Sequence, residues 1–301
     1  MADAVAARHG AESPAEKTRT PAWRQAHLPF LAGTALLLLW YRGVIAFWQA
    51  EWFGSQGYYA HGPLVPLLAA FLVWQRRDQL ARTPVRASAW GVVVVLLGGA
   101  VKLLSTWVST SGVEAFASVS FPVVLWGLAL GIYGGGIARR LIGPAAFLWL
   151  MCPLPGYSVA ELSFPLQLQS TRIGATLANT LGVSVYDQGT TLLVGNLSLF
   201  VDVACSGFKA VLTLLTLSAF AAATSRLRVP HRAALLLSAL PVGLAANGVR
   251  IAAIAWAADR WGQAGAVSAH DYSGLVVLGL ACLGMMAIAR MLGWLSGTDT
   301  W

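Results

Sequence analysis

The stretch FVDVACSGFKAVLTLL, residues 200–215, joins a polar segment to an apolar helix. Cys205, Ser206 and Gly207 stand where the apolar run begins, and Lys209 follows them closely. Unpaired N–H groups at the start of a helix, together with the helix dipole, favour an anion and are expected to lower the pKa of a thiol placed there. The sequence therefore predicts a nucleophile at the end of a membrane helix.

The composition supports a membrane location for that helix. Of the 301 residues, 57% are hydrophobic and only 11% are charged, whereas soluble domains carry roughly a quarter charged residues. The 20 Lys and Arg exceed the 12 Asp and Glu, but they lie in short clusters between apolar runs and indicate topology instead of nucleic-acid binding. Three cysteines cannot form a disulfide framework and leave at least one free thiol.

The apolar runs predict an all-α integral membrane protein with about eight transmembrane helices, because a span of the bilayer needs about 20 residues. An interfacial helix on the outer face is predicted over Val159–Leu181, and a short extended segment within Val183–Val201. The second and fifth spans are short. The predicted spans are Leu28–Trp48, Gly62–Trp74, Trp90–Trp107, Phe116–Ile137, Leu141–Cys152, Phe208–Thr224, Ala233–Ala257 and Ser273–Leu292.

One polytopic membrane domain is predicted over residues 28–293, between a disordered cytoplasmic tail at 1–27 and a short C-terminal tail at 294–301. Within this domain, residues 152–206 are expected to form a long segment on the outer face. Basic residues gather in alternate connecting segments, which predicts that these segments and both termini are cytoplasmic. Seven of the 12 acids fall in the other segments: Glu51, Glu114, Glu161, Asp187, Asp202, Asp259 and Asp271.

Three groups distant in sequence are expected to reach the same membrane depth as Cys205. Arg250 lies 17 residues (250 − 233) beyond the inner start of the seventh span, about 25 Å along a helix, which carries it to the outer interface. Asn247 is three residues (250 − 247) earlier, on the same face. His270 follows a short outer loop at residues 259–269 and opens the eighth span.

Each of these groups also has a simpler interpretation. A membrane cysteine is usually a small packing residue, which is the expectation for Cys152 and Cys282. Arg250 could extend its charge toward the interface, although an ionisable group within an apolar helix is a functional hypothesis by default. His270 alone fits a helix cap as well as a catalyst. The histidines lack the spacing of metal ligands, so neither a metal site nor a cofactor is expected.

Four stretches together resemble the exosortase/archaeosortase family. They are VDVACSGFKAVLTLL at residues 201–215, ANGVRIAAIA at 246–255, His270 before a last helix that contains glycine, and YYAHGPLVPLLAAFLVWQRR at 58–77. The resemblance covers most of the chain from about residue 30 onward. It implies a transpeptidase-like cysteine enzyme of the bacterial inner membrane, with the family's catalytic Cys, Arg and His falling on Cys205, Arg250 and His270.

The resemblance also implies the substrate. Exported proteins with a C-terminal sorting signal, made of a short PEP-type motif, a transmembrane helix and a basic tail, would be cleaved near the motif and passed to an acceptor at the cell surface. The active site would face the periplasm. The acceptor nucleophile is left open, a lipid-linked or polysaccharide-linked group being one option; membrane lipids are the other expected partners, and nucleic acid is not.

The chemistry of the residues fits this role. Cys205 is expected to attack the scissile carbonyl and form a thioester, while His270 moves the proton. Arg250 would stabilise the oxyanion or bind a substrate carboxylate. Asn247 would hold Arg250 or supply a second donor.

Four further residues are weaker candidates for the site. Ser206 and Gly207 support the thiol at the helix start. Asp202 would orient His270 or bind substrate, its alternative being a solvated turn residue. His61, at the outer end of the second span, is a candidate for substrate recognition or a helix cap.

Other classes of protein stay open at this point. A component of polysaccharide export or transport would need Arg250 and Asn247 but not the thiol, and a structural assembly factor would need none of the three groups. A hydrolytic intramembrane cysteine protease would differ only in using water to resolve the thioester.

Overall fold

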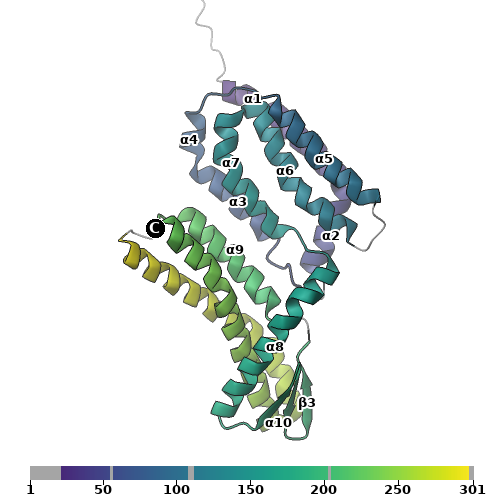
Figure 1. The fold of residues 1–301 in the computed structure, drawn as a ribbon, viewed down its shortest axis with the longest axis vertical. Helices are drawn as coiled ribbons and strands as arrows, with labels where there is room; N and C mark the ends of the chain where they lie inside the picture. Colours follow the sequence, from purple (N-terminus) through teal and green to yellow (C-terminus); the bar gives the residue numbers. More distant parts are fainter. Residues whose placement is uncertain (1–21, 55–56, 108–111, 203–204, 298–301) are drawn as a thin grey trace, which may run out of the picture.

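The computed structural model describes residues 22–54, 57–107, 112–202 and 205–297, and this part of the chain is mostly helical (Figure 1). Its helices are α1 (Ala22–Trp40), α2 (Arg42–Phe53), α3 (Leu64–Gln75), α4 (Arg77–Ala81), α5 (Trp90–Trp107), α6 (Val113–Tyr133), α7 (Gly135–Phe147), the 3₁₀ turn η1 (Leu148–Met151), α8 (Gly156–Thr180), α9 (Phe208–Thr224) and α10 (Val229–Ser296). The predicted tails lie partly outside the described residues, at 1–21 and 298–301. Residues 22–27 belong to α1, and residues 294–296 belong to α10.

The eight predicted crossings are not confirmed. Among the described residues, three helices are long and apolar enough to cross a membrane, namely α5, α6 and α10, and the number rises to five if each of two bent pairs forms one span. α1 and α2 meet at 70°, and the α7–η1 unit meets α8 at 84°. α3 has 12 residues, about 18 Å of helix, which is well short of the hydrocarbon thickness.

The seventh and eighth predicted spans are joined in α10, which folds back on itself at Gly262. The predicted loop at residues 259–269 is helical except at this glycine, whose φ of 67° and ψ of −154° are accessible essentially only to glycine. The two legs, residues 229–261 and 263–296, then run side by side (Figure 1). Leu235 and Ala239 of the first leg pack with Ala281 and Met285 of the second.

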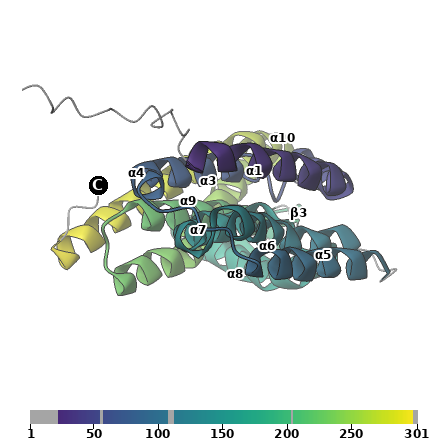
Figure 2. The same ribbon diagram turned by 90° about the horizontal axis from the view of Figure 1, so that it is seen from above.

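The N-terminal helices form the other half of the molecule. α5 and α6 pair closely, and α1 lies over them in the view along the long axis (Figure 2). Buried polar contacts fix this packing: the Tyr41 hydroxyl is 2.6 Å from the Ser120 hydroxyl, and the Trp48 indole donates to Ser118 at 2.8 Å.

The extended segment predicted within 183–201 is confirmed as a small antiparallel sheet. β1 (Val185–Gln188), β2 (Thr191–Val194) and β3 (Leu197–Phe200) follow one another in the order β1-β2-β3. β1 pairs with β2 around Gly189, and β2 pairs with β3 around Gly195. The sheet lies at one end of the molecule, beside α8 and the turn of α10 (Figure 1).

The helix predicted on the outer face corresponds to α8, which exposes Gln169 and Arg172 but buries other polar side chains. Gln167, Ser170 and Thr171 are almost fully buried, as are Gly174 and Ala178 on the same face. These small and polar residues recur every three or four positions and pack α8 against α10. The predicted helix is therefore present, with an inward-facing polar stripe in addition to its exposed polar residues.

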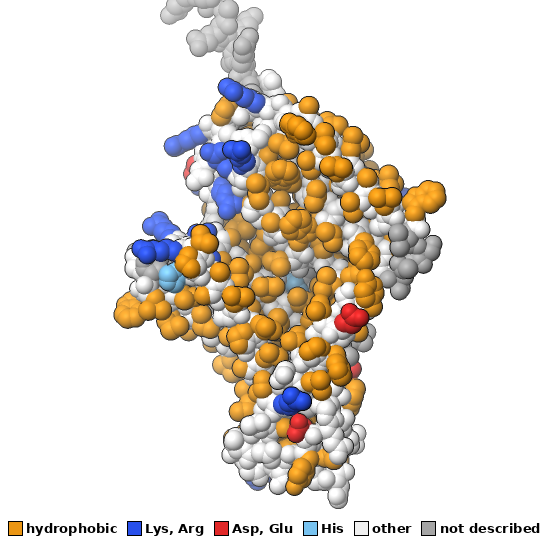
Figure 3. All heavy atoms as spheres, viewed as in Figure 1, with side chains coloured by type: hydrophobic (Ala, Val, Ile, Leu, Met, Phe, Trp, Pro, Cys, Tyr) orange, Lys and Arg blue, Asp and Glu red, His pale blue; other side chains and the backbone are white. Residues whose placement is uncertain are grey.

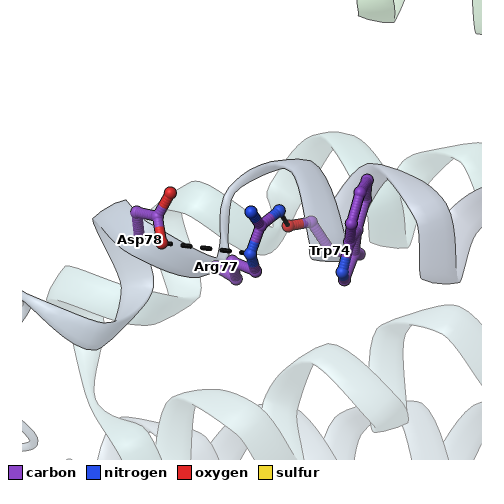
Figure 4. Close-up of polar contacts among 3 residues, drawn as sticks. All are labelled: Trp74, Arg77 and Asp78. Atoms are coloured by element: carbon purple, nitrogen blue, oxygen red, sulfur yellow. Dashed lines mark hydrogen bonds and ion pairs between the residues drawn. The ribbon is translucent and has the colours of Figure 1, made fainter.

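The surface separates apolar and basic regions. Hydrophobic side chains cover most of the face in Figure 3, and most Lys and Arg on it gather near α4 and the end of α9, away from the sheet. Arg77 in this basic region donates to the carbonyl of Trp74 at 3.3 Å, lies over the Trp74 ring, and is 3.9 Å from the carboxylate of Asp78 (Figure 4). The opposite ends of the molecule thus differ in charge.

We expect substitution of Gly248 by Val to destabilise the folded protein. A side chain there would collide with Ile173, because α8 and α10 approach at Gly174 and Gly248. Overpacking of this kind costs about 1–3 kcal/mol. The measurement is loss of the monodisperse, detergent-solubilised protein on heating. Gly279→Val is the matched control, since a Cβ at Gly279 meets nothing within 4 Å; equal melting of the two variants would contradict the packing.

Candidate active site

The segment that carries Cys205 is held through its backbone carbonyls by buried side chains of two helices. From α8, Gln167 donates to the carbonyl of Val201, and the Ser170 hydroxyl donates to the carbonyl of Ser206 at 3.2 Å. From α10, the Asn247 amide donates to the carbonyl of Cys205 at 2.6 Å. The backbone on both sides of the thiol is therefore fixed by buried donors, which have no access to water as an alternative partner.

The start of α9 adds further constraints. The Cys205 N–H donates to the carbonyl of Asp202 at 2.8 Å, and the Ser206 hydroxyl accepts the N–H of Phe208 at 3.2 Å. Gly207 has a φ of 86°, and a Cβ on it would lie 3.1 Å from the Cβ of Asn247. Only glycine suits both the left-handed backbone and the close approach of α10. This turn places the thiol beside α10.

The two legs of α10 bring the other predicted groups to the thiol. The Cys205 Sγ is 3.6 Å from the Nδ1 of His270 on the second leg. The Arg250 guanidinium on the first leg donates through Nη2 to the carbonyl of His270 at 3.2 Å. Its Nε is buried and has no hydrogen-bond partner among the described residues. The structure thus brings Cys205, His270, Arg250 and Asn247 together.

The electrostatics of the thiol differ from the prediction. Cys205 is only 7% exposed, and burial raises the pKa of its thiol above the ordinary value. Arg250 acts in the opposite direction and lowers the pKa, whereas the carboxylate of Asp202 raises it. The helix start was expected to lower this pKa; the prediction was wrong because desolvation of the buried sulfur outweighs the stabilising groups.

A pocket of about 270 Å³ opens beside Cys205 and His270. One wall consists of residues 198–201 of β3 and the segment after it, and the other of residues from both legs of α10. Most of its lining is apolar, including Leu199, Ile251, Ile254 and Val267. Cys205 and His270 therefore share a mainly apolar cavity between the sheet and the turn of α10.

The predicted site residue His61 lies apart from this pocket. Its Nε2 is 3.2 Å from the carbonyl of Leu150, its Nδ1 is buried with no partner among the described residues, and burial lowers its pKa. Its neighbour Tyr58 lies closer to the site: the pKa of Tyr58 is raised by burial first, and then by the charges of Asp202 and Cys205. The described contacts thus connect Tyr58, more directly than His61, to the thiol.

Sequence reasoning missed Gln167 and Ser170, which fix the backbone of the segment that carries Cys205. The signal was present, because Gln167, Ser170, Thr171 and Gly174 recur at helical spacing and predict one small, polar face. They were assigned to an interface with water or lipid headgroups. Among the described residues, no group of three or more His, Cys, Asp or Glu is arranged to hold a metal ion.

The fold and the site define a helical transmembrane protein with a Cys–His pair in a pocket at one end. The model of the transmembrane exosortase family (Exosortase_EpsH) matches residues 48–287, a range that contains Cys205, Arg250 and His270. The chain therefore belongs to the transmembrane exosortase family, and membership implies a transpeptidase-like enzyme that acts on exported proteins with sorting signals. No curated protein and no solved structure matches the chain.

The charges around Cys205 predict opposite shifts in two variants. Because the thiolate is the reactive form, alkylation of Cys205 by iodoacetamide should rise with pH through the raised pKa of the thiol. Arg250→Gln should move this profile to higher pH, and Asp202→Asn to lower pH. The measurement is the pH dependence of alkylation of the Cys205 peptide by mass spectrometry.

Cys282 supplies an internal control for that measurement, because it is far along the second leg and should keep its own profile in both variants. Shifts in the same direction for both variants would contradict the assigned electrostatics.

Proposed function

We propose that this protein is a cysteine-dependent sorting enzyme that cleaves the C-terminal sorting signal of exported proteins and transfers them to a surface acceptor through a thioester on Cys205. The observation that carries the proposal is the 3.6 Å separation of the Cys205 Sγ and the His270 Nδ1 in a pocket that Arg250 adjoins. A transporter or an assembly factor has no need for a thiol held in this way.

In the first step, His270 takes the thiol proton at Nδ1 and the Cys205 sulfur attacks the scissile carbonyl carbon. The negative charge that forms on the carbonyl oxygen requires a donor, and the buried, unpartnered N–H of Arg250 Nε is a candidate for it. The C–N bond then breaks, and the imidazolium returns its proton to the leaving amine. The products are an acyl-thioester on Cys205 and the released C-terminal peptide.

In the second step, an acceptor amine or hydroxyl attacks the thioester carbonyl while His270 takes its proton. The carbon–sulfur bond breaks, and the sulfur leaves as thiolate, which recovers the proton from His270. The raised pKa of the Cys205 thiol supports proton transfer to His270 as part of the attack, since the resting thiol keeps its proton until the nucleophile forms. Water in place of the acceptor would give hydrolysis.

We propose that the sheet and the pocket face the periplasm of a bacterial cell and that both termini are cytoplasmic. The gathering of basic side chains near α4, away from the sheet, supports this orientation by the positive-inside rule (Figure 3). Contact between Arg76 and the carbonyl of Arg140 brings α3 and α7 to the same basic end. Exported substrates, held by a membrane helix and basic tail of their own, would then reach the pocket by lateral diffusion.

The roles of the remaining candidates follow from their contacts. Asn247 orients Cys205 through the backbone, so it is a positioning residue for the nucleophile, not a ligand of Arg250. Asp202 sets the charge around the thiol, and Ser206 and Gly207 shape the turn. In the stretch at residues 58–77, Tyr58 is the residue whose pKa is raised by the charge of Cys205.

Substitution of Cys205 should abolish processing of a tagged exported protein that ends in a PEP-type motif, a membrane helix and a basic tail. Both Cys205→Ala and Cys205→Ser should lose the shortened product, because a serine hydroxyl is a far weaker nucleophile at this position. The measurement is an immunoblot of the substrate in cells with equal membrane levels of each variant.

Cys282→Ala is the matched control and should process normally, since Cys282 lies outside the pocket. Normal processing by Cys205→Ala would overturn the proposal and favour transport or assembly. Mass spectrometry of the wild-type product separates transfer, which adds the acceptor mass, from hydrolysis, which leaves a free carboxylate.

A further inference from the structure

β3 is one of the two edge strands of the sheet, and its outer edge borders the pocket. Residues 198–201 line the cavity consecutively. Side chains alternate between the two faces of a strand, so a cavity against one face would contact every second residue only. Leu192 of β2, the partner of Leu199, also lines the pocket, so the pocket lies against the face that carries these two residues. Ser198 and Phe200 belong to the other face, and their presence in the lining indicates that the pocket extends to the edge of β3.

The register identifies which backbone groups point to that edge. Val201 donates its N–H to the carbonyl of Thr190, toward β2. Antiparallel pairs alternate between hydrogen-bonded and non-hydrogen-bonded positions, so Leu197 and Leu199 also point their N–H and C=O groups to β2. Ser198 and Phe200 point theirs to the outer edge. Both residues are exposed, and Phe200 is followed closely by Cys205.

The opposite wall is the face of a helix. Gln263, Ala266, Val267 and His270 line the pocket from the second leg of α10, at the spacing of one helical face. The space between an open strand edge and a helix face is a slot, and the Cys205 sulfur and the His270 imidazole both line it.

We infer that the substrate segment around the scissile bond binds in this slot as an extended strand, adding a fourth strand to the sheet through the backbones of Ser198 and Phe200. This inference rests on the proposed function and deepens it. The strand's backbone donors and acceptors pair with the free edge, and alternate side chains face the apolar wall at Leu199 and Val267. The scissile carbonyl then lies opposite the thiol.

A polypeptide is the occupant that this surface favours. Among the described residues, no strand pairs with the outward N–H and C=O groups of Ser198 and Phe200. These groups need partners once water is excluded, and an acyl chain offers none. A second copy of this chain, paired edge to edge through β3, would satisfy the same groups but would cover the pocket that holds the nucleophile. The slot beside Cys205 is open to a chain in extended form, which is the form that presents a scissile bond.

Proline substitutions test the strand addition, because proline removes one N–H and is tolerated at edge positions whose N–H faces away from the sheet. Ser198→Pro should lower processing of the tagged substrate about ten-fold at subsaturating substrate, the effect of one lost hydrogen bond. The matched control is Asp187→Pro on the opposite edge, where the register also points the N–H outward and the residue does not line the pocket beside Cys205. It should process like wild type.

Alkylation of Cys205 by iodoacetamide should be the same in the two proline variants, which shows that the nucleophile stays in place. Equal processing by Ser198→Pro and Asp187→Pro, whether high or low, would overturn the strand addition. Loss of processing in Cys205→Ala together with equal processing by the proline pair would leave the proposed function intact and reject only this inference.

Crosslinking gives the register independently. Ser198→Cys in the Cys205→Ala background should form disulfides with single cysteines placed along the substrate just before its membrane helix. Neighbouring strands bring facing Cβ atoms to about 5 Å, so alternate substrate positions should react. Equal yields at consecutive positions, or disulfides only between two copies of the enzyme, would overturn the inference.

Discussion

The reversal of α10 at Gly262 is the constraint on which the site depends. The backbone there adopts a conformation that side chains exclude, and the two legs return alongside each other. Without it, Arg250 and His270 would be separated along one rigid rod, about 30 Å apart at 1.5 Å per residue. With it, the guanidinium reaches the carbonyl of His270, and the same turn closes the far wall of the pocket. The conformation of Gly262 thus allows both legs of one long apolar helix to line the pocket.

The second constraint is the position of the thiol. It is fixed by side-chain hydrogen bonds to the backbone on both sides of Cys205. Side chains from α8 and α10 bind the carbonyls of Val201, Cys205 and Ser206. Amide and hydroxyl donors without charge can be buried at modest cost when each has a partner. Among the described residues, the His270 Nδ1 lies 3.6 Å from the sulfur, and Arg250 lowers the pKa of the thiol.

The sequence predicted the meeting of Cys205, Asn247, Arg250 and His270 because each follows from membrane depth, which counts residues along helices. It did not predict how α10 turns, since Gly262 lies with Gly265 in a short stretch that resembles an ordinary loop. It misjudged α8, whose polar stripe looks the same whether it faces water or a buried backbone. The count of eight spans is not confirmed, because α3 is apolar but too short to cross the hydrocarbon core and two helix pairs are bent. The thiol pKa depends on burial, which composition near Cys205 does not reveal.

The burial of Cys205 has a consequence for the survival of the enzyme between turnovers. Oxidants and disulfides react with thiolates, and a thiol with a raised pKa is mostly protonated near neutral pH. The resting sulfur is therefore a poor target for sulfenic acid formation or for capture by a stray disulfide. The desolvation that disfavours ionisation of the thiol therefore also protects it from oxidation.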